Sequence, residues 1–364
     1  MTPGTRRARR GGRKGGPGRA QRSRPTAGSR RPRPAAGVLL PTSTIGSFPK
    51  PERLKKARAD FARGDLDAGS LRRLEEEATI ECLRLQEDLG LDLLVDGEMY
   101  RGDMTTYFAE QLQGFRISGL VRSYGNRYYR KPIVVGPVRW TRPVTVEWFR
   151  FAQRHAKKPV KGMLTGPYTM MDWSFNEHYP SREALALALA AAIRSEAQAL
   201  VKAGARFIQI DEPAISVRPD EIDLAIRAMR IVTRGLAAHT ITHICYGDFA
   251  SIYPRLLDLP VRQFTLEMSN LDHGLLELFR KKPFTKELGV GVIDVHTHAL
   301  ESVETVRERI RAALAVVPAR RLAVNPDCGL KTRTPAEAEE KLRVMMEAAR
   351  SVRSELSAPG PILL

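Results

Sequence analysis

The segment Thr242-His243-Ile244-Cys245-Tyr246-Gly247-Asp248 decides how the rest of this chain can be interpreted. Its apolar character predicts a short buried strand. Because side chains two positions apart on a strand share a face, His243 and Cys245 can reach one metal ion. Two further candidate ligands follow other predicted strands, namely Glu267 and Cys328. A histidine, a carboxylate and two thiolates fit a tetrahedral Zn²⁺ site.

The carboxylate ligand has two competitors, because Asp248 and Asp327 also follow predicted strands. Strand alternation alone does not choose among the three. The remaining cysteine, Cys82, lies on the apolar stripe of a predicted helix over residues 70–89, so we expect it in the core.

Strands and helices alternate along the chain from Val38 onward. The predicted strands read as continuous apolar runs, which is typical of parallel strands that are buried on both faces. Eight such strands, most of them followed by a helix, predict a (β/α)₈ TIM barrel. The strands are expected at Val38–Ser47, Leu91–Val95, Pro159–Leu164, Arg206–Ile210, the His243 segment, Gln263–Glu267, Val290–Val295 and Leu322–Asn325.

One region interrupts this alternation. Residues 103–140 predict a short helix, Met104–Leu112, and then a β-excursion through Tyr124–Val138. We expect this insertion to lie over the C-terminal face of the barrel, where active sites of this fold are built. Polar or reactive residues follow nearly every predicted strand and would meet at that face: Ser47, Glu98, Thr165, Asp211, His243, Cys245, Glu267, His296 and Cys328.

The formal charge of +18 is concentrated at the N-terminus. Residues 1–36 hold eleven Arg, one Lys and no acidic residue, which leaves +6 for the rest of the chain. Rich in Gly and Pro, residues 1–37 predict a disordered tail, and residues 38–364 form the predicted barrel domain. The alternative is that the tail binds RNA through sequence-independent charge contacts.

Several classes of protein are excluded by composition. No apolar run reaches the roughly 20 residues that a membrane span requires, so no membrane partner is expected. Three cysteines do not build a disulfide framework and favour a reducing, cytoplasmic location. Dinucleotide-binding, P-loop and serine-hydrolase motifs are missing from the sequence.

Seven motifs, in this order, resemble the catalytic C-terminal barrel of cobalamin-independent methionine synthase, and the resemblance covers about residues 42–350. The run from Asn325 to Arg333 is the most specific of them. The motifs are Ile45-Gly46-Ser47-Phe48-Pro49, Asp96-Gly97-Glu98, Gly166-Pro167, Ile208-Gln209-Ile210-Asp211-Glu212-Pro213-Ala214, His243-Ile244-Cys245-Tyr246, Asp294-Val295-His296 and Val324-Asn325-Pro326-Asp327-Cys328-Gly329-Leu330-Lys331-Thr332-Arg333.

This resemblance implies a role for each candidate residue. His243, Cys245, Glu267 and Cys328 would be the zinc ligands. Ile45, Gly46 and Ser47 would hold homocysteine through backbone and hydroxyl groups, and Glu98 and Asp211 would bind its ammonium group. His296 would donate a proton; His298, its competitor, is expected at the rim. Zinc would keep the substrate thiol ionised at neutral pH.

The methyl donor is left open by the sequence. Trp173 matches the family's pterin-stacking tryptophan, and Arg127 and Tyr128 match a folate-contacting pair, with Tyr in place of the usual Cys. Val217 stands where the family has a pterin-binding Glu, which weakens the match to methyltetrahydrofolate. Single-barrel members are thought to use a methyl-corrinoid, free or on a corrinoid protein, so we expect one of these two donors.

The sequence therefore predicts a zinc-dependent methyltransferase that converts homocysteine to methionine. One alternative is a zinc-dependent alkyltransferase that acts on another thiol. An alternative from a different class is an RNA-binding protein that acts through residues 1–36.

Overall fold

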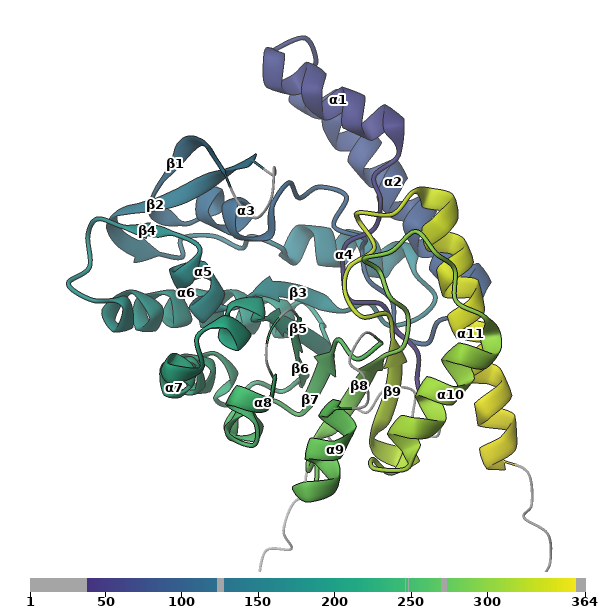
Figure 1. Ribbon diagram of the computed structural model, residues 1–364. Coiled ribbons are helices and arrows are strands. Elements are labelled where there is room, and N and C mark those ends of the chain that lie inside the picture. Colours follow the sequence, from purple (N-terminus) through teal and green to yellow (C-terminus); the bar gives the residue numbers. More distant parts are fainter. Residues whose placement is uncertain (1–37, 123–127, 246, 248, 270–273, 358–364) are drawn as a thin grey trace, which may run out of the picture. The chain divides into compact units, whose positions relative to one another are not determined.

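The computed structural model describes residues 38–122, 128–245, 247, 249–269 and 274–357 (Figure 1). The basic tail and the folate-contact candidate Arg127 lie outside these residues, so both remain predictions. The competing ligand Asp248 also lies outside them.

Six parallel strands form the main sheet, in the order β3-β5-β6-β7-β8-β9. Nearly every residue in them is buried, which agrees with the apolar runs in the sequence. Their bounds are β3 Gly162–Thr165, β5 Phe207–Asp211, β6 His239–Ile244, β7 Gln263–Leu266, β8 Glu287–Gly291 and β9 Leu322–Asn325.

Two shorter segments close this sheet into a barrel. Thr42 pairs with Val324 of β9, Ser43 pairs with Leu93, and Leu94 pairs with Val160 just before β3, all in parallel. The eight-stranded barrel is therefore confirmed, but the first two strands are single bridges rather than the longer strands predicted. Pro41 contributes to this because it has no N–H to donate to a ladder.

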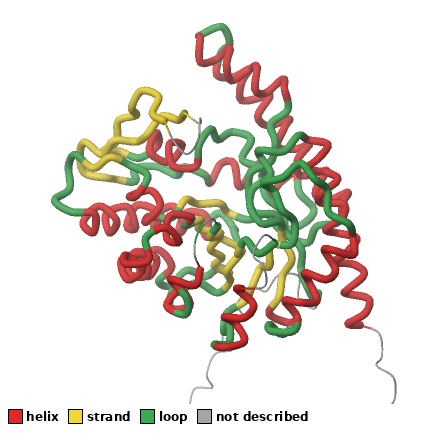
Figure 2. Tube along the Cα trace, viewed as in Figure 1, coloured by secondary structure: helices red, strands yellow, loops and turns green. Residues whose placement is uncertain are grey.

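Helices surround the parallel strands, as Figures 1 and 2 show. Side chains cap several of them; for example, Asp67 accepts a hydrogen bond from the Ser70 N–H at the start of α2. The α-helices are α1 Glu52–Arg63, α2 Ala68–Leu89, α3 Met104–Gln111, α4 Val146–His155, α5 Pro167–Asp172, α6 Arg182–Lys202, α7 Ile222–Thr233, α8 Phe249–Ile252, α9 Gly274–Lys281, α10 Val303–Leu314 and α11 Pro335–Ser357. Short 3₁₀ helices are η1 Pro213–Val217, η2 Pro219–Glu221, η3 Arg255–Asp258 and η4 Ala319–Arg321.

Helix α6 is long and apolar enough to cross a membrane, and it is the one such helix in the part of the chain that the structure describes. Half of its most apolar stretch is buried inside the protein, and Leu185, Leu189 and Ile193 belong to the core. This is the behaviour of a core helix that packs on a sheet.

The two strands of the insertion after α3 and a short strand that follows α5 form a separate three-stranded sheet, in the order β1-β2-β4 (Figure 2). Their bounds are β1 Gln113–Arg122, β2 Tyr128–Arg139 and β4 Phe175–Asn176. The Thr165 hydroxyl, at the C-terminal end of β3, donates to the Met104 carbonyl (2.8 Å). In turn, the Thr106 hydroxyl donates to the Arg130 carbonyl in β2 (2.7 Å). These bonds attach the predicted β-excursion to the C-terminal end of a barrel strand.

Cys82 is buried on α2, as predicted. Burial raises the pKa of its thiol, and Gln86 lies against it. It is therefore a core residue.

Candidate metal and amino-acid site

A histidine and two thiols meet at the C-terminal end of the barrel. His243 belongs to β6, Cys245 follows this strand by one residue, and Cys328 follows β9. Their ligand atoms all lie within 4.8 Å of one another, and the two sulfur atoms are 3.7 Å apart. Three of the four predicted metal ligands are therefore brought together from strands far apart in the sequence.

His243 has the hydrogen-bond pattern of a metal ligand. Its Nδ1 lies 3.2 Å from the Thr265 carbonyl oxygen, which accepts a hydrogen bond from an Nδ1–H. This contact leaves Nε2, which is buried, as the ring nitrogen that could bind a metal ion. A carbonyl that fixes the tautomer in this way is typical of metal-binding histidines. The residues present thus fit a divalent metal ion.

The two thiols differ in acidity. Contact with Cys245 and then with His243 holds the pKa of Cys328 well below its ordinary value, although burial opposes this. The same contact, burial and the charge of Glu267 raise the pKa of Cys245. These opposite shifts favour the thiolate on Cys328, and a thiolate is the form that binds metal.

Glu267, the fourth predicted ligand, follows β7 and lies at the edge of this cluster. Its carboxylate is 3.3 Å from Nε2 of His296, and it is not among the three residues whose ligand atoms group within 4.8 Å. The hydrogen bond with Glu267 raises the pKa of His296. The structure thus places the predicted ligand Glu267 against the predicted proton donor.

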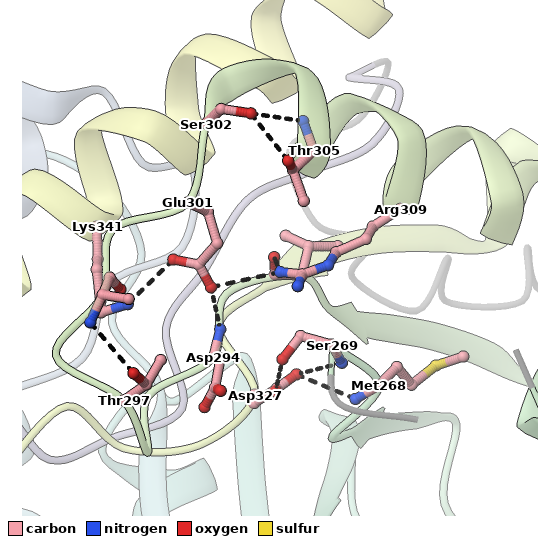
Figure 3. Close-up of polar contacts among 12 residues, drawn as sticks. Met268, Ser269, Asp294, Thr297, Glu301, Ser302, Thr305, Arg309, Asp327 and Lys341 are labelled. Atoms are coloured by element: carbon pink, nitrogen blue, oxygen red, sulfur yellow. Dashed lines mark hydrogen bonds and ion pairs between the residues drawn. The ribbon is translucent and has the colours of Figure 1, made fainter. Parts of the chain in front are cut away.

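Asp327, the competing ligand, has another role in the fold. Its Oδ1 accepts from the backbone N–H groups of Met268 and Ser269 (3.0 Å each), and the Ser269 hydroxyl also binds it (Figure 3). Gly291 is required here, because a Cβ would lie 2.2 Å from Asp327 Oδ1. Asp327 therefore braces the segment that carries Glu267.

A second brace holds the segment of His296. The His296 N–H donates to Asp294 Oδ1 (2.7 Å), and the Asp294 N–H donates to Glu301 (2.6 Å). Glu301 also forms ion pairs with Arg309 (3.3 Å) and with the buried ammonium of Lys341 (3.0 Å). Both contacts are drawn in Figure 3. The competitor His298 is exposed and pairs with Glu337, as expected for a rim residue.

Glu98 lies beside Gly46 in a strained backbone conformation. Its φ is 56°, a left-handed region that residues other than glycine seldom adopt and that often occurs at functional sites. A Cβ on Gly46 would lie only 2.7 Å from Glu98 Oε1, so the glycine allows this close approach. Arg101, which is buried, lies 3.5 Å from the same carboxylate.

Asp211 is the last residue of β5, and the charges of both His243 and Glu98 act on its carboxyl group. Burial raises its pKa to about 6, whereas the charge of His243 and a hydrogen bond from Gln209 act to lower it. The neighbouring Glu212 points elsewhere, because its carboxylate accepts from the Tyr168 and Thr169 N–H groups at the start of α5. Of the two adjacent acids, Asp211 is therefore the one that interacts with residues at the mouth of the barrel.

A buried lysine and glutamine below this carboxylate escaped the sequence analysis. The Lys161 ammonium donates to Gln209 Oε1 (2.6 Å) and to the Thr44 carbonyl. Gln209 Nε2 donates to Asp211 (2.7 Å) and to the Ile45 carbonyl (2.9 Å). Burial lowers the pKa of Lys161 to about 7, and the charges of Asp211 and Glu98 oppose this. Polar residues within apolar parallel strands were the signal that could have revealed both.

The predicted backbone clamp is also held by cross-barrel contacts. The Ser47 carbonyl accepts from the Leu330 N–H (2.7 Å), in the loop that carries Cys328. A Cβ on Gly329 would lie 2.2 Å from Ser47 Oγ. Ile45, Gly46 and Ser47 thus border both Glu98 and the loop of Cys328.

The residues predicted to bind the methyl donor are not grouped in this way. Trp173 is half-buried at the end of α5, while Tyr128 is 61% exposed at the start of β2. Phe175, close to Trp173 in sequence, pairs with Ile133, so Tyr128 lies roughly 17 Å further along the strand. The described residues do not bring these two aromatic side chains together.

The fold and this cluster define a TIM-barrel protein with a candidate thiolate-metal site at its C-terminal mouth. Residues 40–351 match the family described as "Cobalamin-independent synthase, Catalytic domain", and the chain belongs to this family. The predicted family and fold are thus confirmed.

Individual relatives agree with this assignment. The chain is 42% identical over 327 residues to 5-methyltetrahydropteroyltriglutamate–homocysteine methyltransferase of Mycolicibacterium paratuberculosis, covering 86% of this chain and 43% of the relative. It therefore spans less than half the length of that relative. It is 38% identical to methionine synthase of Saccharolobus solfataricus, covering 88% of this chain and 97% of the relative. A B12-independent methionine synthase structure from Shewanella, in complex with selenomethionine, matches with a TM-score of 0.78, 32% identity and coverage of 88% and 99%.

These comparisons correct one prediction. The names of the first relatives specify a methyltetrahydropteroyltriglutamate donor, and the family is cobalamin-independent. The expectation of a methyl-corrinoid donor, or of a corrinoid partner protein, is at odds with that family. The presence of Val217 where the family has an acidic residue was too weak a signal to identify the donor.

Proposed function

We propose that this chain is a zinc-dependent methyltransferase that makes methionine from homocysteine, with a 5-methyltetrahydropteroylglutamate as methyl donor. The observation that carries the proposal is the cluster of His243, Cys245 and Cys328, whose ligand atoms all lie within 4.8 Å of one another. The names of the relatives support the two substrates.

The metal would be held by His243, Cys245 and Cys328, with Glu267 as the fourth candidate ligand. When bound, Zn²⁺ supplies a positive charge that favours the thiolate form of a sulfhydryl at neutral pH. Zinc rather than a harder ion suits this set, because two of the donors are thiolates.

The amino-acid end of homocysteine would be bound across the mouth. Glu98 and Asp211 supply carboxylate groups, which suit an ammonium group. The Lys161–Gln209 pair fixes Asp211, and the segment of Ser47 offers backbone groups to the carboxylate. Two carboxylates of this kind favour an amino-acid thiol over a thiol without an amine.

Methyl transfer needs a proton for the leaving group. The homocysteine sulfur forms a bond to the methyl carbon, the bond from that carbon to N5 of the folate breaks, and N5 takes the electron pair and a proton. His296 is suited to supply this proton, because its contact with Glu267 raises its pKa and so favours the imidazolium form. The bond to Asp294 and the brace at Glu301 hold its segment in place.

The proposal is tested by giving the purified chain homocysteine and 5-methyltetrahydropteroyltriglutamate and measuring methionine. We expect methionine with the wild-type chain and with Cys82→Ala, and none above background with Cys328→Ser. Cys82→Ala is the matched control, because this cysteine lies in the core away from the cluster. Full activity of Cys328→Ser, or methylation only of thiols without an amine, would contradict the proposal.

A further inference from the structure

A buried lysine lies inside the barrel below the mouth. Lys161 comes immediately before β3, and its ammonium donates to Gln209 Oε1 (2.6 Å) and to the Thr44 carbonyl. The charges of Asp211 and Glu98 both act on it. Removing an ammonium group from water into a barrel interior is costly, so this position needs an explanation beyond packing.

The lysine fixes which way the Gln209 amide faces. An ammonium group can only donate hydrogen bonds, so it binds the amide oxygen and not the amide nitrogen. The Nε2 group must then point the other way, where it donates to Asp211 Oδ1 (2.7 Å) and to the Ile45 carbonyl (2.9 Å). If the amide were reversed, its oxygen would face the Asp211 carboxylate, and two acceptors repel each other.

The amide in turn determines which oxygen of Asp211 is left for a ligand. Gln209 and Asp211 are two positions apart on β5, so their side chains point to the same side of the strand. Oδ1 of Asp211 is bound by Gln209, whereas Oδ2 has no hydrogen bond within the described residues. Oδ2 is therefore the atom that can receive the ammonium group of an amino acid.

The same lysine–glutamine pair also holds the backbone of the first barrel segment. The ammonium binds the Thr44 carbonyl, and the amide binds the carbonyl of the next residue, Ile45. Gly46 follows directly, and a Cβ there would lie 2.7 Å from Glu98 Oε1. The pair thus connects the backbone beside Glu98 with the carboxylate of Asp211.

We propose that Lys161 is a positioning residue for the amino-acid end of the substrate and that it acts through the Gln209 amide. It sets the orientation of Asp211 and the place of the backbone before Ser47, and so determines how strongly an α-ammonium group is preferred. This rests on the proposed function and adds to it the two residues that create the selectivity for an amino-acid thiol over a thiol without an amine.

A double-mutant cycle separates a role through Gln209 from a direct effect of the lysine charge. A charge acts on Asp211 and on a bound ammonium group whether or not Gln209 is present. An orienting contact has no effect once the amide is gone. Lys161→Met should therefore lower the selectivity in the wild-type chain and leave it unchanged in Gln209→Leu.

The test is binding to the purified chain, measured by calorimetry without a methyl donor. The two ligands are L-homocysteine and 4-mercaptobutanoate, which has the same thiol chain and carboxylate but no amine, and the ratio of their dissociation constants is the selectivity. We expect Lys161→Met and Gln209→Leu each to lower the selectivity roughly tenfold, the scale of one lost charge-assisted hydrogen bond. The double variant should lower it no further. Because both partners are then apolar, the double variant should fold even where Lys161→Met alone does not.

Lys286→Met is the matched control, because the Lys286 ammonium also donates to backbone carbonyls, those of Leu259 and Val261, but at the N-terminal end of the barrel. It should keep the selectivity of the wild type. The inference is overturned if Lys161→Met or the double variant keeps the wild-type selectivity, or if adding Lys161→Met to Gln209→Leu lowers it further. These results leave the proposed function intact, whereas equal binding of both thiols by the wild type overturns the inference and the proposed amine site together. If the wild type is selective and the cycle behaves as expected but no methionine forms, the proposed reaction fails while the positioning role stands.

Discussion

Charged side chains have different surroundings at the two ends of the barrel. At the N-terminal end, Lys286 donates to the Leu259 and Val261 carbonyls, and Arg262 pairs with Glu287 (2.7 Å). At the C-terminal mouth, His243 Nε2 and the Lys50 ammonium have no such partner within the described structure. The charges at the N-terminal end are paired within the fold, whereas the mouth also keeps polar groups available for ligands.

Cavity size alone would not reveal this division. A cavity of about 770 Å³ lies at the N-terminal end, lined in part by Arg262, Lys286 and Arg321. The Arg321 guanidinium there donates to the Phe284 carbonyl (2.8 Å), so these cations are already used by the fold. Unsatisfied polar groups therefore locate the candidate site better than cavity volume does.

The largest effect is expected from removing a ligand at the mouth. His243→Ala should lower methionine formation at least about a thousandfold, because the metal loses its only nitrogen ligand among the candidates. Initial rates at saturating substrates measure this, and thermal unfolding should show a folded protein. A rate within tenfold of the wild type would remove His243 from the site.

The next effect is expected at the amine-binding carboxylates. Glu98→Gln should raise the KM for homocysteine by roughly thirtyfold or more, because the ammonium loses a charged partner, while the Kd for the folate donor stays unchanged. Steady-state kinetics with varied homocysteine measure it. An unchanged KM would mean that Glu98 serves only its contact with Arg101.

A smaller effect on turnover is expected from the brace of His296. Lys341→Met removes a buried ammonium from Glu301 and should lower kcat by roughly tenfold to a hundredfold, as loss of a positioning contact does. It should also shift the pH profile of kcat, because His296 would lose its fixed position. Unchanged KM values and metal content would separate this role from general unfolding.

At the opposite end, substitution should affect stability alone. Arg262→Met should lower the free energy of unfolding by about 1 kcal/mol, the scale of a partly exposed ion pair, and leave kcat per folded molecule unchanged. Urea unfolding and initial rates measure the two quantities. A large loss of activity in this variant would break the division between the two ends.

The sequence predicted most of the fold because parallel strands buried on both faces leave a clear apolar pattern. The closing segments at Thr42 and Leu93 were harder, since a single bridge needs its neighbours in space and leaves little local pattern. The cluster of His243, Cys245 and Cys328 was predictable because each residue follows a strand of the same barrel.

Other parts of the site depended on three-dimensional contacts. Strand alternation did not decide whether Glu267 or Asp327 is the carboxylate ligand. The contacts of Asp327 with the Met268 and Ser269 N–H groups show that Asp327 holds the segment of Glu267 in place. Lys161 was missed because a buried lysine is interpretable only when its partners, the Thr44 carbonyl and Gln209, are known.

The most direct test of the central claim is metal analysis of the purified wild-type chain and of Cys245→Ala by mass spectrometry. We expect one zinc ion per wild-type chain, lost in Cys245→Ala together with methionine formation. A wild-type chain that forms methionine while free of metal would contradict the account.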